Sequence, residues 1–112
     1  MDCIFCKIIA GEIPSAILYR DKDIVAFPDI HPLTPVHLLI APTRHIPSLA
    51  HMTDEETPLV GKMVKAANKL ARELNLAEKG YRLTINSGAD AGQVVPHLHM
   101  HLMGGRALDW KH

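Results

Sequence analysis

The sequence of 112 residues has few aromatic side chains and no excess of charge of either sign. Twelve Lys and Arg residues balance twelve Asp and Glu residues, and the aromatic set is two Phe, two Tyr and one Trp. A protein that binds nucleic acid through its field needs a basic face, and one that stacks bases needs aromatic platforms. The composition therefore argues against a nucleic-acid-binding protein.

Long hydrophobic runs are missing too, since no apolar segment reaches the roughly 20 residues that a membrane-spanning helix needs. The opening stretch, MDCIFCKIIAGEIP, lacks the basic start and the small-residue cleavage site of a secretory signal. We therefore expect a cytoplasmic protein that does not bind membranes. In a reducing cytosol the two cysteines, Cys3 and Cys6, are expected to be thiols or metal ligands and not a disulfide.

What the sequence does contain is one clear helical pattern among several short strand patterns. Residues 53–76 carry apolar side chains at helical spacing, Thr53 and Glu56 fit a capping box, and Pro58 falls in the first turn. Residues 3–14 predict a short helix closed by a glycine and a proline, and Gly80 is expected to end the long helix region.

The remaining periodic segments predict strands. These are 16–30, as two strands around a turn at residues 21–23, then 36–42, 81–86 and 94–105. Tight turns between neighbouring strands favour an antiparallel sheet, and we expect the helices to cover one of its faces. The sequence thus predicts one α+β domain over residues 1–112.

Residues 97–103 read HLHMHLM, with a histidine at every second position: His97, His99 and His101. In a strand, such positions share one face, so the histidines point one way and the intervening apolar residues point into a core. Solvated side chains are one interpretation, and a metal site is a second, because two neighbours of such a set could share an ion.

A nucleophilic site is the third interpretation, and we favour it. A neutral imidazole can attack phosphorus when its other ring nitrogen is held protonated by an acceptor. The preceding segment SGADAGQ, residues 87–93, has glycines that let backbone N–H groups approach phosphate oxygens.

The segment GQVVPHLHMHLM resembles the signature of the histidine triad (HIT) family, His-φ-His-φ-His-φ-φ, in which φ is a hydrophobic residue. Other blocks resemble the family in the same order: IFCKIIAGEIPS, DIVAFPDIHPLTPVHLLIAPTRHI, GYRLTINSG and, as in its Hint branch, GGRALDW. The resemblance covers nearly the whole chain. It implies a five-stranded antiparallel sheet with one long helix and a short N-terminal helix, assembled as a homodimer, with Trp110 as a candidate contact.

The resemblance also implies an activity: a nucleotide hydrolase or transferase that acts at the α-phosphate and releases a nucleoside monophosphate. His99 would be the nucleophile, with His101 and His37 as its catalytic partners. Nucleotide contacts are implied at Asp29, Ile30, Asn86, Gly92, Gln93, Val94, His99 and His101. Phe5 and Phe27 resemble the apolar lining of the base pocket.

Three positions carry an alternative. Asp29 is a turn-forming residue, so by itself it could simply cap the turn before Pro32, and Asn86 could likewise serve a turn after its strand. Val94 stands where many eukaryotic members have a Ser or Thr near the leaving group, which puts the rate and the substrate preference in doubt.

Cys3 and Cys6 form a C-x-x-C pair, which is weak evidence for zinc because such a site needs two further ligands. By themselves the two could be small apolar residues on a helix. They resemble bacterial HIT proteins that begin CIFCKI and bind a structural zinc, and this implies His45 and His97 as the remaining ligands. His51 is the spare candidate.

The leading hypothesis is therefore cleavage of purine nucleoside 5′-phosphoramidates through a nucleotidyl intermediate on His99. A dinucleoside polyphosphate hydrolase and a nucleotide-binding protein with vestigial catalysis are the alternatives. A zinc hydrolase that uses His97 and His99 as catalytic ligands is a weaker one.

Overall fold

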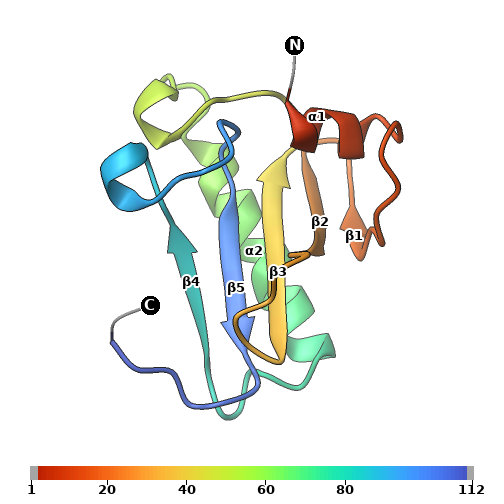
Figure 1. Cartoon of the computed structure of the whole chain (residues 1–112), viewed down its shortest axis with the longest axis vertical. Helices are drawn as coiled ribbons and strands as arrows, with labels where there is room; N and C mark the ends of the chain where they lie inside the picture. The colour runs from red at the N-terminus through yellow and green to blue at the C-terminus, as the bar shows by residue number, and fades with distance from the viewer. Residues whose placement is uncertain (1–2, 111–112) are drawn as a thin grey trace.

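An antiparallel sheet of five strands, in the order β1-β2-β3-β5-β4, forms the centre of the molecule, as the computed structural model shows for residues 3–110 (Figure 1). The strands are β1 (Tyr19–Arg20), β2 (Ile24–Pro28), β3 (Val36–Pro42), β4 (Tyr81–Ile85) and β5 (Met100–Gly104). All neighbouring strands are antiparallel. The predicted α+β class is confirmed, and β3 has the predicted bounds.

The two helices lie on opposite faces of the sheet, so the prediction that they share one face is wrong (Figure 1). Helix α2 (Pro58–Glu73) packs on one face, with Ile24, Ala26, Leu38 and Ile40 of the central strands among its core. Helix α1 (Ile4–Ile9) covers the other face. The residues of β2 and β3 that point away from α2 are mostly apolar as well, so the second face of the sheet must also be buried.

Helix α2 is shorter than the predicted 53–76 at both ends. The Glu56 carboxylate accepts the Thr53 N–H (2.9 Å), as a capping box requires, but residues 54–57 form turns. Pro58 has no N–H to continue the hydrogen-bond ladder, so the regular helix begins there. At the other end Asn75, with φ of 61°, ends the helix well before Gly80. The Leu76 N–H bonds to the Ala71 carbonyl (2.8 Å), as in a Schellman cap.

The last strand also begins later than predicted, at Met100 instead of residue 94. Residues 94–99 approach the sheet as irregular chain, and the Leu98 N–H donates to the Ile46 carbonyl (2.7 Å) instead of a strand neighbour. Pro96 cannot donate to a strand ladder. The alternation survives, because Leu98, Met100 and Leu102 all lie in the α2-side core.

The remaining elements are the short 3₁₀ helices η1 (Leu49–His51) and η2 (Ala89–Ala91), which the sequence did not indicate. In the part of the chain that the structure describes, no helix is long and apolar enough to cross a membrane. The cytoplasmic location and the single domain over 1–112 stay predictions, and residues 1–2 and 111–112 of that domain lie outside the described residues.

Candidate active site and metal centre

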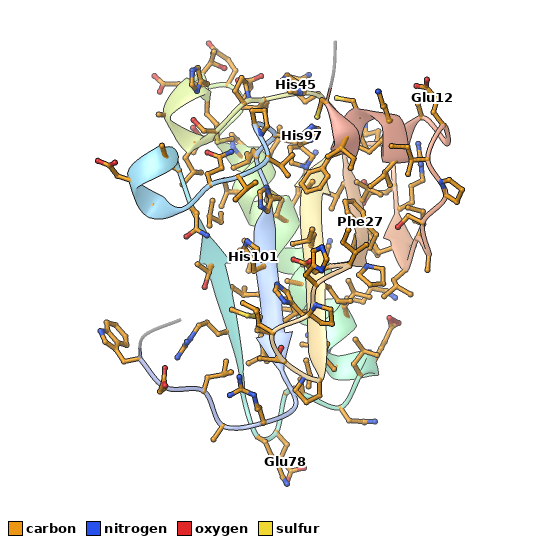
Figure 2. All side chains as sticks on the ribbon, in the orientation of Figure 1. Glu12, Phe27, His45, Glu78, His97 and His101 are labelled. Atoms are coloured by element: carbon orange, nitrogen blue, oxygen red, sulfur yellow. The ribbon has the colours of Figure 1, made fainter. Side chains whose placement is uncertain are left out.

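The α1 face of the sheet carries two polar clusters, which meet at His97 and His99. Strands β3 and β5 run side by side with Leu39 opposite His101, which places the His37 and His101 side chains on this face. The His37 Nε2 lies 2.9 Å from the His101 Nδ1. Figure 2 shows His101 near the middle of the sheet, with His97 and His45 farther along toward α1.

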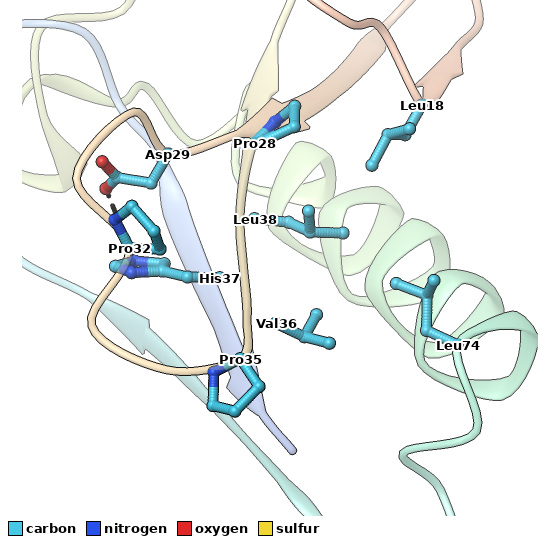
Figure 3. Close-up of a pocket in the computed structure, with 9 residues that line it drawn as sticks. All are labelled: Leu18, Pro28, Asp29, Pro32, Pro35, Val36, His37, Leu38 and Leu74. Carbon is cyan, nitrogen blue, oxygen red and sulfur yellow. Dashed lines mark ion pairs between the residues drawn. The ribbon is translucent and has the colours of Figure 1, made fainter. Parts of the chain in front are cut away.

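Backbone contacts decide which nitrogen of His37 carries the proton. Its Nδ1 accepts the Leu33 N–H (3.0 Å), so the proton is on Nε2 and is donated to the His101 Nδ1. The Asp29 Oδ2 lies 3.5 Å from that same Nε2 (Figure 3). The neutral His101 therefore carries its own proton on Nε2, where it is a donor.

Asp29 also has the structural role that its sequence context suggested. Its Oδ1 accepts the His31 N–H (2.9 Å), which forms an Asx turn at the start of the loop. The two oxygens thus have separate tasks, since one shapes the loop and the other faces His37.

His99 has the arrangement that a nucleophilic imidazole needs. Its Nδ1 is 2.7 Å from the His97 carbonyl oxygen, which can only accept, so the Nδ1 proton is donated there. The Nε2 atom is left with a free lone pair. The ring is 7% exposed and makes edge contacts with Phe5 and His101, with ring centroids 5.1 Å and 5.0 Å away.

Burial keeps the supporting histidines neutral. It lowers the pKa of His37, although the charge of Asp29 opposes the effect. Burial, followed by the charges of His99 and His37, lowers the pKa of His101 to about 4. At neutral pH the pair is therefore an uncharged chain of donors, with the Asp29 carboxylate at its end.

The second cluster consists of Cys3, Cys6, His45 and His97, whose ligand atoms all lie within 4.8 Å of one another. The His97 Nδ1 is 3.3 Å from the Cys3 Sγ and 3.6 Å from the Cys6 Sγ, and the His45 Nδ1 is 3.4 Å from the Cys6 Sγ. Ligands of a tetrahedral zinc, with bonds of roughly 2.3 Å to sulfur and 2.0 Å to nitrogen, have S···N separations of about 3.5 Å.

The chemistry of the cluster also fits a metal ion. The His97 Nε2 donates to the Pro42 carbonyl (2.9 Å), which leaves Nδ1 unprotonated toward the sulfurs. Burial and the neighbouring Cys3 raise the pKa of the Cys6 thiol to about 11, and a bound cation would reverse that shift. Two thiolates and two imidazoles are a zinc-type donor set. The spare candidate His51 is not in this cluster, because its Nδ1 pairs with the Ser48 Oγ (2.7 Å).

Asp29, His37 and His101 also lie close enough to surround an ion, but the proton positions oppose it. A metal on the His37 Nε2 would require the proton on Nδ1, where the Leu33 N–H already points. We therefore assign this group to hydrogen bonding.

Comparison with known proteins gives the family. Residues 10–108 match the HIT domain. The chain belongs to the HIT family. The purine nucleoside phosphoramidase of Escherichia coli K12 is 46% identical over 107 residues, which cover 96% of this chain and 90% of that one.

Solved HIT structures agree with this chain in fold as well as in sequence. A HIT family hydrolase from Legionella pneumophila superposes with a TM-score of 0.95 at 44% identity and covers 98% of both chains. A histidine triad protein from Clostridium difficile has a TM-score of 0.95 at 43% identity, over 97% of this chain and 95% of that one. The predicted family and fold are thus confirmed, and the named relatives place the chain among hydrolases.

The nucleotide contacts that the HIT resemblance implies are of two kinds: positions that are open to a ligand, and one side chain that is turned into the protein. Ile30 and Val94 are 81% and 89% exposed, and Gly92 has a left-handed backbone with φ of 87°. Asn86 is half-buried and directly follows β4. These positions are open to a ligand, and their contacts with nucleotide stay predictions.

Gln93 differs, because its side chain is turned into the protein. Its Oε1 accepts the Gly88 N–H (2.8 Å), and its Nε2 donates to the Pro47 and Val95 carbonyls (2.8 and 2.9 Å). The side chain therefore braces the loop, a role that sequence reasoning missed. Only the Gly-Gln pair at the loop's end hinted at it.

A hollow of about 260 Å³ at the end of the β2–β3 hairpin is shown in Figure 3. Leu18, Val36, Leu38 and Leu74 line its α2 side, with Asp29 and His37 at the other. His99 is not part of its lining.

Proposed function

We propose that this HIT-family hydrolase cleaves purine nucleoside 5′-phosphoramidates at the α-phosphate, with His99 as the nucleophile. The observation that carries the proposal is the Nδ1 bond of His99 to the His97 carbonyl, which leaves Nε2 free on a ring next to His101. The name of the Escherichia coli relative supports the substrate class.

In the first step the His99 Nε2 attacks the α-phosphorus. A new P–N bond to imidazole forms, the P–N bond to the leaving amine breaks, and the amine takes up a proton from the solvent. In the second step water attacks the phosphorus, the P–N bond to His99 breaks, and a proton of the water passes to the solvent, which releases the nucleoside monophosphate and restores His99.

The other polar groups support the charge that develops on the phosphate. In the hydrogen-bond chain, the His101 Nε2–H is the donor nearest to His99. His37 and Asp29 hold His101 in the tautomer that is protonated at Nε2. In the loop at residues 88–92 the N–H groups of Gly88, Ala91 and Gly92 are bonded within the loop, so contacts with phosphate oxygens would fall to the N–H groups of Ala89 and Asp90.

The test is release of AMP from adenosine 5′-phosphoramidate by the purified protein. We expect His99→Ala to lower kcat by about 10³-fold or more while AMP still binds. His31→Ala, an exposed histidine of the same hairpin loop, is the matched control and should keep full activity. Normal turnover by His99→Ala would overturn the mechanism.

Two further outcomes separate the alternatives. Faster turnover of diadenosine polyphosphates than of the phosphoramidate would favour the dinucleoside polyphosphate hydrolase. Tight AMP binding without turnover of either substrate would favour a nucleotide-binding protein, and the exposed Val94 would be the residue to change.

We also propose that the Cys3, Cys6, His45 and His97 cluster holds a structural zinc ion. Zinc would supply a closed tetrahedral link between α1 and the chain next to β3 and β5, and all four ligand positions would be taken by protein. Metal analysis should find one zinc per chain, and less than a tenth of that in Cys6→Ser.

The assembly that we propose is a homodimer. Strand β4 is an edge of the sheet, and Trp110 is 94% exposed, as is typical of a side chain that a partner covers. Sedimentation of the protein should give twice the mass of the chain, and a concentration-independent monomer would contradict the proposal.

A further inference from the structure

His97 joins the metal cluster to the nucleophile through one residue. Its ring places Nδ1 among the cysteine sulfurs, while its backbone carbonyl accepts the His99 Nδ1–H at 2.7 Å. The His97 ring is fully buried and is held at its far side by the Pro42 carbonyl. A ligand bond at Nδ1 would therefore leave this residue little freedom to rotate, and its carbonyl would share the restriction.

Helix α1 makes a second connection between the same two places. It has six residues, and Cys3 caps its start, with the Cys6 N–H 3.4 Å from the Cys3 Sγ. Phe5 lies between the two cysteines in sequence, and its ring makes edge contacts with both His97 (centroids 5.7 Å apart) and His99 (5.1 Å apart). So short a helix is not stable by itself, and what holds it on the sheet also holds Phe5 against the nucleophile.

From these contacts we propose that metal at the Cys3, Cys6, His45 and His97 cluster positions the nucleophile His99, so that occupancy of the cluster governs turnover as well as fold stability. This inference rests on the proposed function of His99. The metal takes no part in the reaction. His97 and Phe5 are positioning residues, which hold the His99 ring with Nε2 toward the substrate.

The proposal predicts a specific kinetic signature. Without the metal, the His97 carbonyl and Phe5 are free to move, and the His99 ring samples orientations in which Nε2 is not aligned for attack. Misplacement of a reacting group by about 1 Å lowers the rate roughly 10²-fold, whereas binding of the nucleotide depends on other contacts. We expect kcat to fall at least tenfold and KM to change less than about threefold.

His45→Ala and Cys6→Ser are the variants for this test, because the structure places both ligands away from His99: His45 contacts His97 and Cys6, and Cys6 contacts Cys3, His45 and His97. His51→Ala is the matched control, since His51 lies in the same region, is exposed and is not in the cluster. It should keep both metal and kcat. Circular dichroism must show that the variants are folded at the assay temperature.

The decisive readout is independent of turnover: ¹⁵N NMR of the His99 ring, with and without metal. In the loaded protein we expect one tautomer, protonated at Nδ1 by its bond to the His97 carbonyl. After chelation, and in His45→Ala, we expect an averaged signal, and restoration when zinc is returned to the chelated wild type. An unchanged single-tautomer signal in the metal-free, folded protein would overturn the proposal.

A second readout uses the reverse direction of the coupling. With ¹¹³Cd in place of zinc, AMP added to the wild-type protein should shift the cadmium resonance, because linkage between two sites is reciprocal. No shift at saturating AMP would count against the proposal. If the loaded wild type released no AMP from the phosphoramidate, the proposed function would fail, and the NMR comparison would still decide whether the metal positions His99.

Discussion

The first and second histidines of the run, His97 and His99, use the same side chain in opposite ways. At His97 the ring donates from Nε2 to the Pro42 carbonyl and leaves Nδ1 free, toward two sulfurs. At His99, two residues later, the ring donates from Nδ1 to the His97 carbonyl and leaves Nε2 free. The nearest backbone carbonyl selects the nitrogen that stays unprotonated, and that choice suits one histidine to the metal-ligand role and the other to the nucleophile role that we propose.

The difference extends to what surrounds each ring. The end at His97, where we propose the metal, is closed, because His97 is fully buried, and a metal there would stabilise the fold. The proposed catalytic end is backed by a neutral hydrogen-bond chain, and His101 there is only partly buried. Changes at the first end should therefore alter stability as well as turnover, and changes at the second should alter turnover with little effect on stability.

Removal of a sulfur ligand should give the largest effect. Cys3→Ser is expected to cost about 3 kcal/mol of stability and to lower the Tm by roughly 15 °C, because the link between α1 and the sheet is lost. Thermal unfolding of zinc-loaded proteins measures it. His99→Ala, measured alongside, should move the Tm by less than about 3 °C. Equal losses in the two variants would erase the distinction between the ends.

Loss of the donor to His101 should be the next largest effect. His37→Leu leaves the His101 Nδ1 without its donor and should lower kcat about 30-fold, with a smaller effect on KM. His37→Gln, which can still donate, should recover part of that loss. If His37→Leu and His37→Gln were equally active, the hydrogen-bond chain would have no role in turnover.

Acid should destabilise the catalytic end through His101. The unfolded chain binds a proton on this imidazole below about pH 6.5, whereas the folded chain excludes it until about pH 4. The stability that the neutral ring contributes is complete above about pH 6.5 and is lost as the pH falls toward 4.

The contribution of His101 is best measured as a difference in Tm between the wild type and a His101 variant, because acid also protonates the proposed metal ligands in both proteins. The Tm of the wild type should fall by about 4 °C or more relative to His101→Gln between pH 6.5 and pH 4.5. Parallel curves for the two proteins would show that His101 does not titrate in this range.

The smallest effect is expected at the leaving-group side. Val94→Ser adds a hydroxyl at a position that is 89% exposed, so the Tm should not change. If the hydroxyl reaches the leaving amine, kcat should rise roughly threefold. Val94→Ala is the control for loss of the valine, and an equal rise in both variants would rule out assistance by the hydroxyl.

Much of the candidate site could be anticipated from the sequence, and the misses have physical causes. The alternation in HLHMHLM predicted two faces correctly, although His97 and His99 precede the strand. The alternation extends beyond the strand because the segment is buried on both sides. Its apolar residues face one side and its histidines face the other, whichever hydrogen bonds its backbone makes. The resemblance to the HIT family predicts a nucleotide contact at Gln93, and the sequence did not indicate that its side chain points into the protein.

The helix ends teach the same lesson. The hydrogen bond between Thr53 and Glu56 forms as predicted. Pro58, however, interrupts the hydrogen-bond ladder of the helix, so the residues before it form turns. Both signals are local in the sequence, and only their competition in three dimensions decides the first residue of the helix.

By itself the sequence determined the class of fold, because periodicity records which side chains face inward, and its resemblance to the HIT family indicated the family and the residues expected at the site. The tertiary structure alone decided which carbonyl each imidazole meets, and hence which nitrogen is free. It also decided that α1 covers the histidine face. These features depend on backbone groups of Pro42, His97 and Leu33, which are alike in every residue and acquire a role only where the fold brings them.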